Sequence, residues 1–195
     1  MSLRIARIPP SEVEASLDAM ARLRIVVFRD FPYLYDGDME SERDYIAKYR
    51  DSSNAIVIGA WDGETLVGAA TGTPMEDHAA EFAAPFEDAG YALGKMFYCA
   101  ESVLLQPYRG QGAGHAFFDH REAHARTLGR RWSCFCSVVR PPELQPPGYR
   151  PHDVFWGKRG YAPMPGVYAE FKWKDVGDTT ETKKSLQFWI KDLEQ

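Results

Sequence analysis

The sequence has no long apolar run. Its apolar stretches all fall short of the ~20 residues that a membrane-spanning helix needs, so we expect no such helix. The first residues, Met-Ser-Leu-Arg-Ile-Ala-Arg, also lack the apolar centre of a secretory signal peptide. A cytoplasmic location is therefore expected.

The sequence also lacks an excess of positive charge and has few cysteines. The 195 residues carry a formal net charge of −5, which argues against a nucleic-acid or membrane partner, because such partners attract basic surfaces. The three cysteines, Cys99, Cys134 and Cys136, all fall in predicted strands. An odd number in such positions favours buried reduced thiols over disulfide bonds. We interpret Cys134 and Cys136 as core residues rather than nucleophiles.

A metal-binding pattern is also missing. His120 and His124 stand four residues apart in a predicted helix and could reach one ion. However, Arg121 occupies the place of the glutamate in an H-E-x-x-H motif, and no third ligand is evident. We expect ordinary surface or packing histidines and no metal.

Apolar residues, by contrast, are plentiful at 45% of the chain, enough for one domain over residues 1–195 with a substantial core. Turn residues and apolar spacing predict two helices near the N-terminus, with Ser11 and Ser41 as their N-caps. A segment over residues 76–91 is ambiguous and contains a short helix at most. The remaining elements are strands at 4–8, 55–61, 65–71, 96–105, 132–139, 167–173 and 185–190, and helices ending near 129 and spanning 153–159.

The most informative segment begins with the apolar strand at 96–105. This strand is interrupted by one acidic residue, Glu101, and is followed by Arg-Gly-Gln-Gly-Ala-Gly and a helical pattern. Glycines permit a tight turn and a close ligand, and the first amides of a helix attract anions, so the segment predicts a phosphate site. The dinucleotide-binding motif G-x-G-x-x-G does not match, because its third glycine is replaced by His115 or Phe117, depending on the starting glycine. A P-loop does not match either, because no lysine follows the glycines.

The spacing that fits is Arg-x-x-Gly-x-Gly, from Arg109 through Gly112 to Gly114. It resembles the acetyl-CoA loop of the GNAT acyltransferase superfamily, [QR]-x-x-G-x-[GA]. Residues 155–161, Phe-Trp-Gly-Lys-Arg-Gly-Tyr, resemble the family's F-Y-x-K-x-G-[FY] segment. The order of the predicted strands and helices is also similar to that of the GNAT family. The resemblance implies an α/β fold with a mixed, bent sheet of about six to seven strands flanked by helices.

The resemblance also implies a coenzyme A site. In the family, a bulge separates the strand that carries the acid from its neighbour, and the pantetheine binds to the exposed backbone. The matching backbone here belongs to Val103, Leu104 and Leu105. The pyrophosphate would be held by Arg109, Gly110, Gln111, Gly112, Ala113, Gly114 and His115, and the flanking helix would contribute Phe155, Trp156 and Lys158.

Glu101 is the expected general base. A carboxylate within an apolar strand is costly unless it is paired or functional, and relatives often use an acidic residue here to meet the acceptor amine. The alternative is an ion pair with an arginine at the edge of the core.

The proton donor departs from the family pattern. Many relatives have a tyrosine near the sulfur of coenzyme A where this chain has Trp156, and an indole N–H is no practical acid. Tyr149, Tyr161, Tyr168 or water could replace it, although Tyr161 is expected in the core.

The acceptor site would involve the loop between the first two helices, with Tyr33, Tyr35 and Asp36 attracting a cationic amine. An ordinary solvated acidic loop explains the same residues equally well. The expected function is acetyl-CoA-dependent N-acetylation of a primary amine on a small molecule or peptide. A CoA-binding module without turnover, a longer acyl chain and a hydroxyl acceptor are the alternatives. Either a monomer or a homodimer fits.

Overall fold

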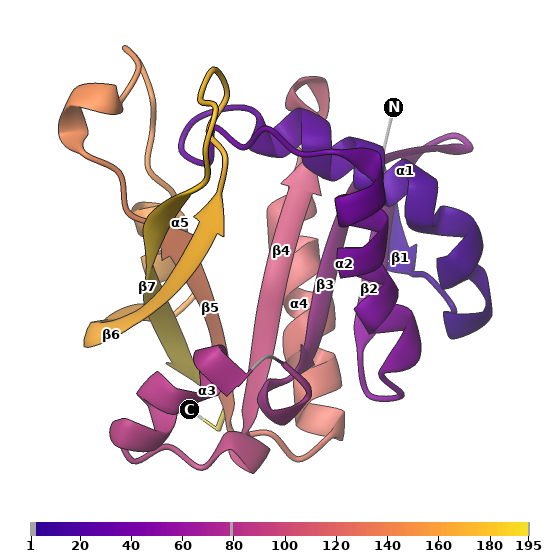
Figure 1. Cartoon of the computed structure of the whole chain (residues 1–195). Coiled ribbons are helices and arrows are strands. Elements are labelled where there is room, and N and C mark those ends of the chain that lie inside the picture. The colour runs from indigo at the N-terminus through magenta and orange to yellow at the C-terminus, as the bar shows by residue number, and fades with distance from the viewer. Residues whose placement is uncertain (1–2, 79, 195) are drawn as a thin grey trace.

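The fold is built on one mixed sheet, seen in a computed structural model that describes residues 3–78 and 80–194. Seven strands follow the order β1-β2-β3-β4-β5-β7-β6 (Figure 1). Neighbours are antiparallel except for β4 and β5, which are parallel. The expected mixed sheet is confirmed. The strands are β1 (Arg4–Arg7), β2 (Ile56–Asp62), β3 (Thr65–Pro74), β4 (Met96–Leu104), β5 (Trp132–Val138), β6 (Ala162–Trp173) and β7 (Thr182–Asp192).

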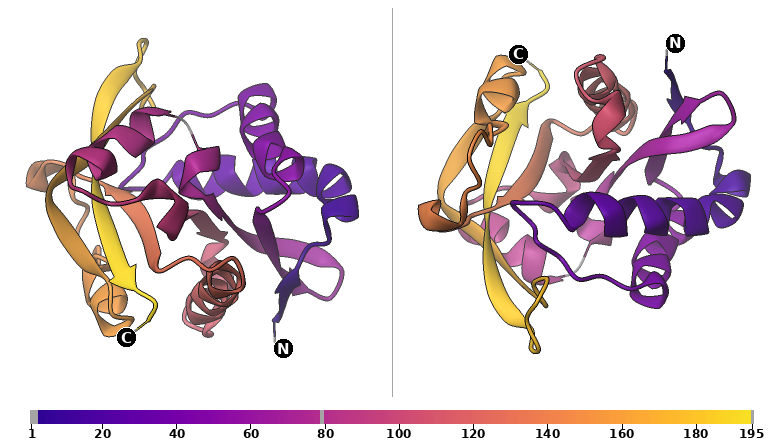
Figure 2. Two further views of the ribbon diagram at one scale, coloured as in Figure 1. Left: turned by 90° about the horizontal axis from the view of Figure 1, so that it is seen from below. Right: turned by 90° about the horizontal axis from the view of Figure 1, so that it is seen from above.

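Helices cover both faces of the sheet. Figure 2 shows α1, α2 and α3 on one side and α4 and α5 on the other. Short 3-10 turns lie at residues 75–77, 93–95, 106–108 and 142–144. The helices are α1 (Pro10–Phe28), α2 (Met39–Asp51), α3 (Ala80–Asp88), α4 (Ala113–Thr127) and α5 (Asp153–Lys158).

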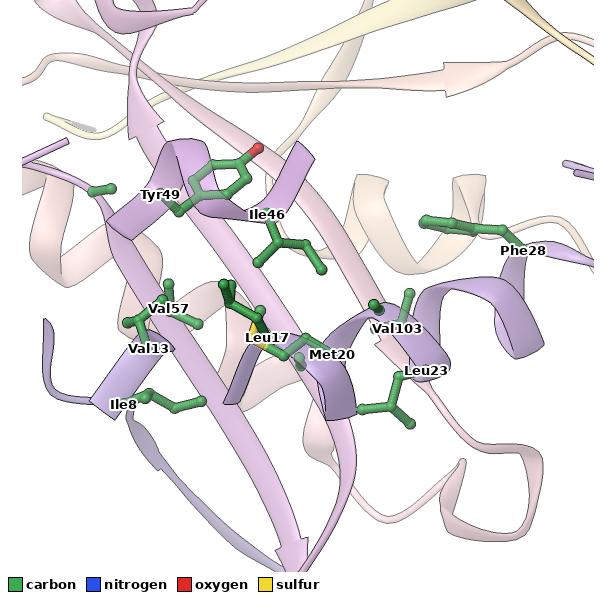
Figure 3. Close-up of a cluster of buried hydrophobic side chains, with 13 residues drawn as sticks. Ile8, Val13, Leu17, Met20, Leu23, Phe28, Ile46, Tyr49, Val57 and Val103 are labelled. Carbon is green, nitrogen blue, oxygen red and sulfur yellow. The ribbon is translucent and has the colours of Figure 1, made fainter. Parts of the chain in front are cut away.

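The apolar core follows from the spacing of apolar residues. Along α1, buried Val13, Leu17 and Met20 recur every three or four residues and so lie on one helix face. They pack with α2 against β2, β3 and β4, as Figure 3 shows. A second cluster lies under α4 and α5, and a third lies between α3 and the strands β4 to β7.

Both helix starts differ from expectation. Ser11 does not cap α1, which begins at Pro10, because proline's fixed φ suits the first turn of a helix. Ser41 does not cap α2, because Asp38 precedes it and its carboxylate accepts the Ser41 amide at 2.9 Å. In the C-terminal hairpin, β6 and β7 are longer than predicted. Among the described residues, no helix is both long and apolar enough to cross a membrane.

Candidate functional site

The site is a gap between the two parallel strands in the middle of the sheet. The pairing of β4 with β5 covers only three residue pairs and ends at Tyr98 and Cys134. Beyond this point the two strands diverge, as Figure 1 shows. The upper part of β4 therefore keeps β3 as its one paired neighbour and presents its other edge to the gap.

A bulge in β4 lies where the strands diverge. Cys99 of β4 is paired with Gly72 of β3, and Ser102 with Ala70. Two residues of β4 thus lie between these pairs, opposite one residue of β3. The extra residue places Ala100 and Glu101 on the same face, toward α1. Ser102 then points to the other face, where α4 lies. The expected bulge is present, and it turns the Glu101 carboxylate toward the α1–α2 side.

Arg121 of α4 holds this bulge from behind. Its side chain is 1% exposed, and Nη1 donates to the carbonyls of Glu101 at 3.0 Å and Thr71 at 3.3 Å. Nη2 donates to the Ser102 hydroxyl at 2.9 Å. A bulge leaves backbone groups without strand partners. The guanidinium supplies donors to these carbonyls.

Replacing Arg121 by methionine, which has a similar length, is expected to lower the free energy of unfolding by about 3 kcal/mol, because two buried carbonyls lose their donor. Urea denaturation measures this change. Arg126→Met on the same helix is the control, since Arg126 is exposed and donates to the Leu193 carbonyl. It should cost less than about 1 kcal/mol. Equal losses in the two variants would contradict the role of Arg121.

The register also decides which backbone groups face the gap. The Leu105 amide donates to the Val67 carbonyl at 3.0 Å. Since backbone groups along a strand point alternately to either side, Val103 and Leu105 face β3, whereas Ser102 and Leu104 face the gap. The Leu104 carbonyl accepts Nε of Arg109 at 3.1 Å. Of the three residues expected at the pantetheine, only Leu104 presents its backbone there, and Ser102 joins it.

The glycine loop closes one end of the gap. Gly110 and Gly112 have φ of 79° and 86°, in the left-handed region that glycine tolerates best. Nothing lies within 4 Å of a Cβ built on either residue. Gly112 is also the N-cap of α4, with no side-chain cap, so the first amides of the helix are left for a ligand.

Helix α5 brings the second motif against the first. A Cβ built on Gly114 would lie 3.4 Å from the Phe155 ring, and the His115 ring is 4.9 Å from the same ring. Trp156 packs on Phe135 and Trp189, with ring centroids 4.9 and 5.1 Å away. Lys158 is exposed. The two sequence motifs, about forty residues apart, thus meet in space.

Glu101 is buried, at 7% exposure. It forms an ion pair with an arginine, the alternative to a role as general base. Nη1 of Arg24 lies 3.1 Å from its Oε2. Arg24 also pairs with Glu42 of α2. Burial opposes the charged guanidinium, but Glu101, Tyr45 and Glu42 raise the pKa of Arg24 above its usual value. Two carboxylates thus share one cation.

The carboxylate of Glu101 keeps hydrogen-bonding capacity despite this pair. Neither of its oxygens accepts a hydrogen bond of good geometry from the described residues. A buried carboxylate oxygen without a donor is costly. A donor from a bound molecule would lower that cost.

The predicted acceptor residues separate into two groups. Asp36 pairs with Lys174 at 2.8 Å and Arg29 at 3.3 Å, and the Lys174 hydrogen bond lowers the pKa of Asp36. Tyr33 and Tyr35 instead pack against the cluster under α1 and α2. Burial raises the pKa of both hydroxyls.

The candidate acids lie in different surroundings. Tyr161 is in the core as expected, and its hydroxyl bonds Ser133 at 2.7 Å and Glu122 at 3.2 Å. Tyr149 packs its ring edge-on to Phe31 at 4.7 Å. Tyr168 is exposed on β6. No tyrosine takes the place of Trp156 in the α5 motif.

The cysteines lie in the core, and His124 forms a hydrogen-bond contact with a backbone carbonyl. All three cysteines are free and buried, and burial raises the pKa of Cys136 to about 12. The thiol is therefore protonated at neutral pH, as a core residue would be. The His124 ring contacts the Asn54 carbonyl at 2.9 Å. In the described part of the chain, no three His, Cys, Asp or Glu side chains are grouped to hold a metal.

The buried roles of Arg24 and Arg121 were not predicted from the sequence, although the spacing of apolar residues around them carried a signal. Arg24 follows Leu17, Met20 and Ala21 at helical spacing, within the apolar stripe of α1. Arg121 follows Phe117 and Phe118 in the same way. A charged residue in an apolar stripe indicates a buried partner.

Comparisons with known proteins agree with this fold. Three solved structures have a similar fold. One is an aminoglycoside 6'-N-acetyltransferase with coenzyme A, at 14% identity and a TM-score of 0.63, with 97% of both chains covered. The others are the yncA protein of Salmonella typhimurium with acetyl-CoA (11%, 0.60, 100% of this chain and 96% of that chain) and the PaiA N-acetyltransferase of Thermoplasma acidophilum with coenzyme A (12%, 0.54, 98% and 99%). At these identities the likeness shows the fold alone. No curated protein matches the sequence significantly.

The family follows from the sequence match. A model of the acetyltransferase (GNAT) family matches residues 20–139, more than half of the chain. The matched range contains the bulged β4, the glycine loop and α4. The chain therefore belongs to the GNAT family of acetyltransferases.

Proposed function

We propose that this protein transfers the acetyl group of acetyl-CoA directly to a primary amine of a small molecule or peptide, in a ternary complex. The bulge in β4 carries the proposal, because it combines a free backbone edge with a buried carboxylate at one gap. Three structural neighbours solved with acetyl-CoA or coenzyme A support the choice of donor.

The residues on the gap suit coenzyme A. Backbone amides at residues 109–115, at the start of α4, would hold the pyrophosphate. The backbone of Ser102 and Leu104 would bind the amides of the pantetheine. Phe155 and Trp156 of α5 would flank it, with Lys158 adding an exposed positive charge. This arrangement needs backbone shape more than particular side chains.

Acetyl-CoA, when bound, supplies an activated acetyl thioester. Glu101 accepts a proton from the acceptor ammonium, directly or through water. Glu101 and Glu42 share Arg24, so a cationic acceptor would meet two carboxylates beside one guanidinium. A gap-facing amide of Ser102 or Leu104 can donate to the thioester carbonyl. Tyr161 lies in the core, so the proton for the leaving thiolate comes from Tyr149, Tyr168 or water, the other donors that the sequence offers.

The acceptor would lie on the α1–α2 side of the sheet, because the Glu101 carboxylate points there. Tyr33 and Tyr35 line this side. Asp36 is paired with Lys174 and Arg29, so we do not give it a role in binding the amine.

Amine-dependent release of free thiol from acetyl-CoA tests the function. The panel should include aminoglycosides, diamines, amino acids and short peptides, each with and without enzyme. Competition with longer acyl-CoAs would test the choice of acyl group. Tight coenzyme A binding with no turnover on any amine would instead support a CoA-binding module, the alternative that Trp156 favours.

A further inference from the structure

Arg140, directly after β5, joins three segments that are distant in the sequence. Its side chain is 7% exposed. Two of its nitrogens donate to the Asp175 carboxylate, at 2.7 and 2.9 Å. It also donates to the Pro32 carbonyl at 2.7 Å and to the Tyr33 carbonyl. Arg140 therefore ties the α1–α2 loop to the turn between β6 and β7.

Backbone hydrogen bonds also join the α1–α2 loop to the turn between β6 and β7. The Asp36 amide donates to the Lys174 carbonyl at 2.9 Å, and the Val176 amide donates to the Leu34 carbonyl at 2.7 Å. The loop thus pairs with the β6–β7 hairpin like a short strand. Figure 1 shows the loop running from α1 toward this hairpin across the upper ends of β4 and β5.

Tyr33 is the side chain that this attachment places over the gap. It packs against the cluster under α1 and α2 and also against the third cluster, between α3 and the strands β4 to β7. Its ring lies 4.5 Å from Phe28 and 6.0 Å from Trp173, whose indole donates to the Tyr33 carbonyl at 3.1 Å. Tyr33 therefore contacts structure on both sides of the separated strands.

The backbone next to Tyr33 needs such support. Leu34 has φ of 53°, a left-handed conformation that a leucine adopts at an energetic cost. Such a conformation persists where surrounding contacts determine it. The paired Leu34 carbonyl and the Arg140 bonds on either side of Tyr33 provide those contacts.

We propose that Arg140 is a positioning residue, which holds Tyr33 over the gap between β4 and β5 and so sets the affinity for the acceptor. This inference rests on the proposed function for its effect on the acceptor. Arg140 itself contacts neither substrate. Its loss should free the loop and weaken binding of the amine, while the coenzyme A site near α4 keeps its shape.

Arg140→Met tests the inference, with Arg130→Met as its matched control. The Arg130 side chain is 10% exposed, pairs with Glu76 at 2.7 Å and donates to the Gly94 carbonyl at 2.7 Å, but at the other end of β5. Hydrogen exchange at residues 30–37 should accelerate at least tenfold in Arg140→Met and stay unchanged in Arg130→Met. Unchanged exchange in Arg140→Met would overturn the attachment.

Kinetics provide the second readout. With the most active amine of the panel, KM for the amine should rise at least tenfold in Arg140→Met, with the Kd for acetyl-CoA within twofold. Arg140→Lys keeps the charge beside Asp175 and should recover part of the loss. A similar rise in Arg130→Met, or a fall in kcat alone, would overturn the positioning role. Because exchange needs no acceptor, failure of the proposed function is distinguishable from failure of the attachment.

Discussion

Replacing Glu101 by glutamine is expected to lower kcat by about 10²–10⁴-fold, the range typical of a lost general base. Glutamine keeps the size of the side chain but cannot take a proton from the acceptor. The Kd for acetyl-CoA should stay nearly unchanged, because the glycine loop and the gap-facing backbone do not involve the carboxylate. Steady-state kinetics and calorimetric binding measure the two quantities.

Glu42→Gln is the matched control for Glu101→Gln. Each variant removes one of the two carboxylates that share Arg24, so each leaves Arg24 with one charged partner. Only Glu101 stands on β4 at the gap. We expect the kcat of Glu42→Gln to fall by less than about tenfold.

The comparison of the two variants separates the role of a base from that of an ion-pair partner. A fully active Glu101→Gln protein would remove Glu101 from the mechanism and leave it as the partner of Arg24.

The second large effect is expected from Gly112→Val. A valine at φ of 86° is strained, and its side chain would enter the open space in front of the α4 amides. The Kd for coenzyme A should rise by about 100-fold, equivalent to about 2.8 kcal/mol of binding free energy. Isothermal calorimetry measures the change without any acceptor.

Gly129→Val controls for the strain itself. Gly129 lies just past the other end of α4, has φ of 66°, and also has nothing within 4 Å of a built Cβ. Both variants should lose similar unfolding free energy, and only Gly112→Val should lose affinity for coenzyme A. If Gly112→Val binds coenzyme A normally, the loop does not hold the pyrophosphate.

The glycine loop was predictable because its requirements are local. A left-handed backbone and a helix start are properties of adjacent residues, so the spacing of Gly110, Gly112 and Gly114 was informative without any fold. The same holds for the apolar spacing of β4, which was predicted within one residue of its observed end. Helix starts were less predictable, since Asp38 and Ser41 are equally good caps by residue type.

The partners of buried charges were not predictable. The position of Glu101 in an apolar strand indicated a paired or functional carboxylate, but its partner, Arg24, appears only in the fold. The family resemblance implied a bulge, but the residues at which it falls appear only in the pairing with β3. The same register shows that the backbone groups of Val103 and Leu105 face β3, whereas those of Ser102 and Leu104 face the gap.

The sequence by itself determined the order of elements, the glycine loop and the family, since these depend on residues close together in the chain or on a matched pattern. The tertiary structure alone decided which distant groups meet. Arg140 reaches carbonyls more than 100 residues earlier, and Arg121 reaches the carbonyls at the β4 bulge. A buried charge or carbonyl needs a hydrogen-bonding or charged partner, but residue type does not specify which one. The packing of the helices and strands determines that partner.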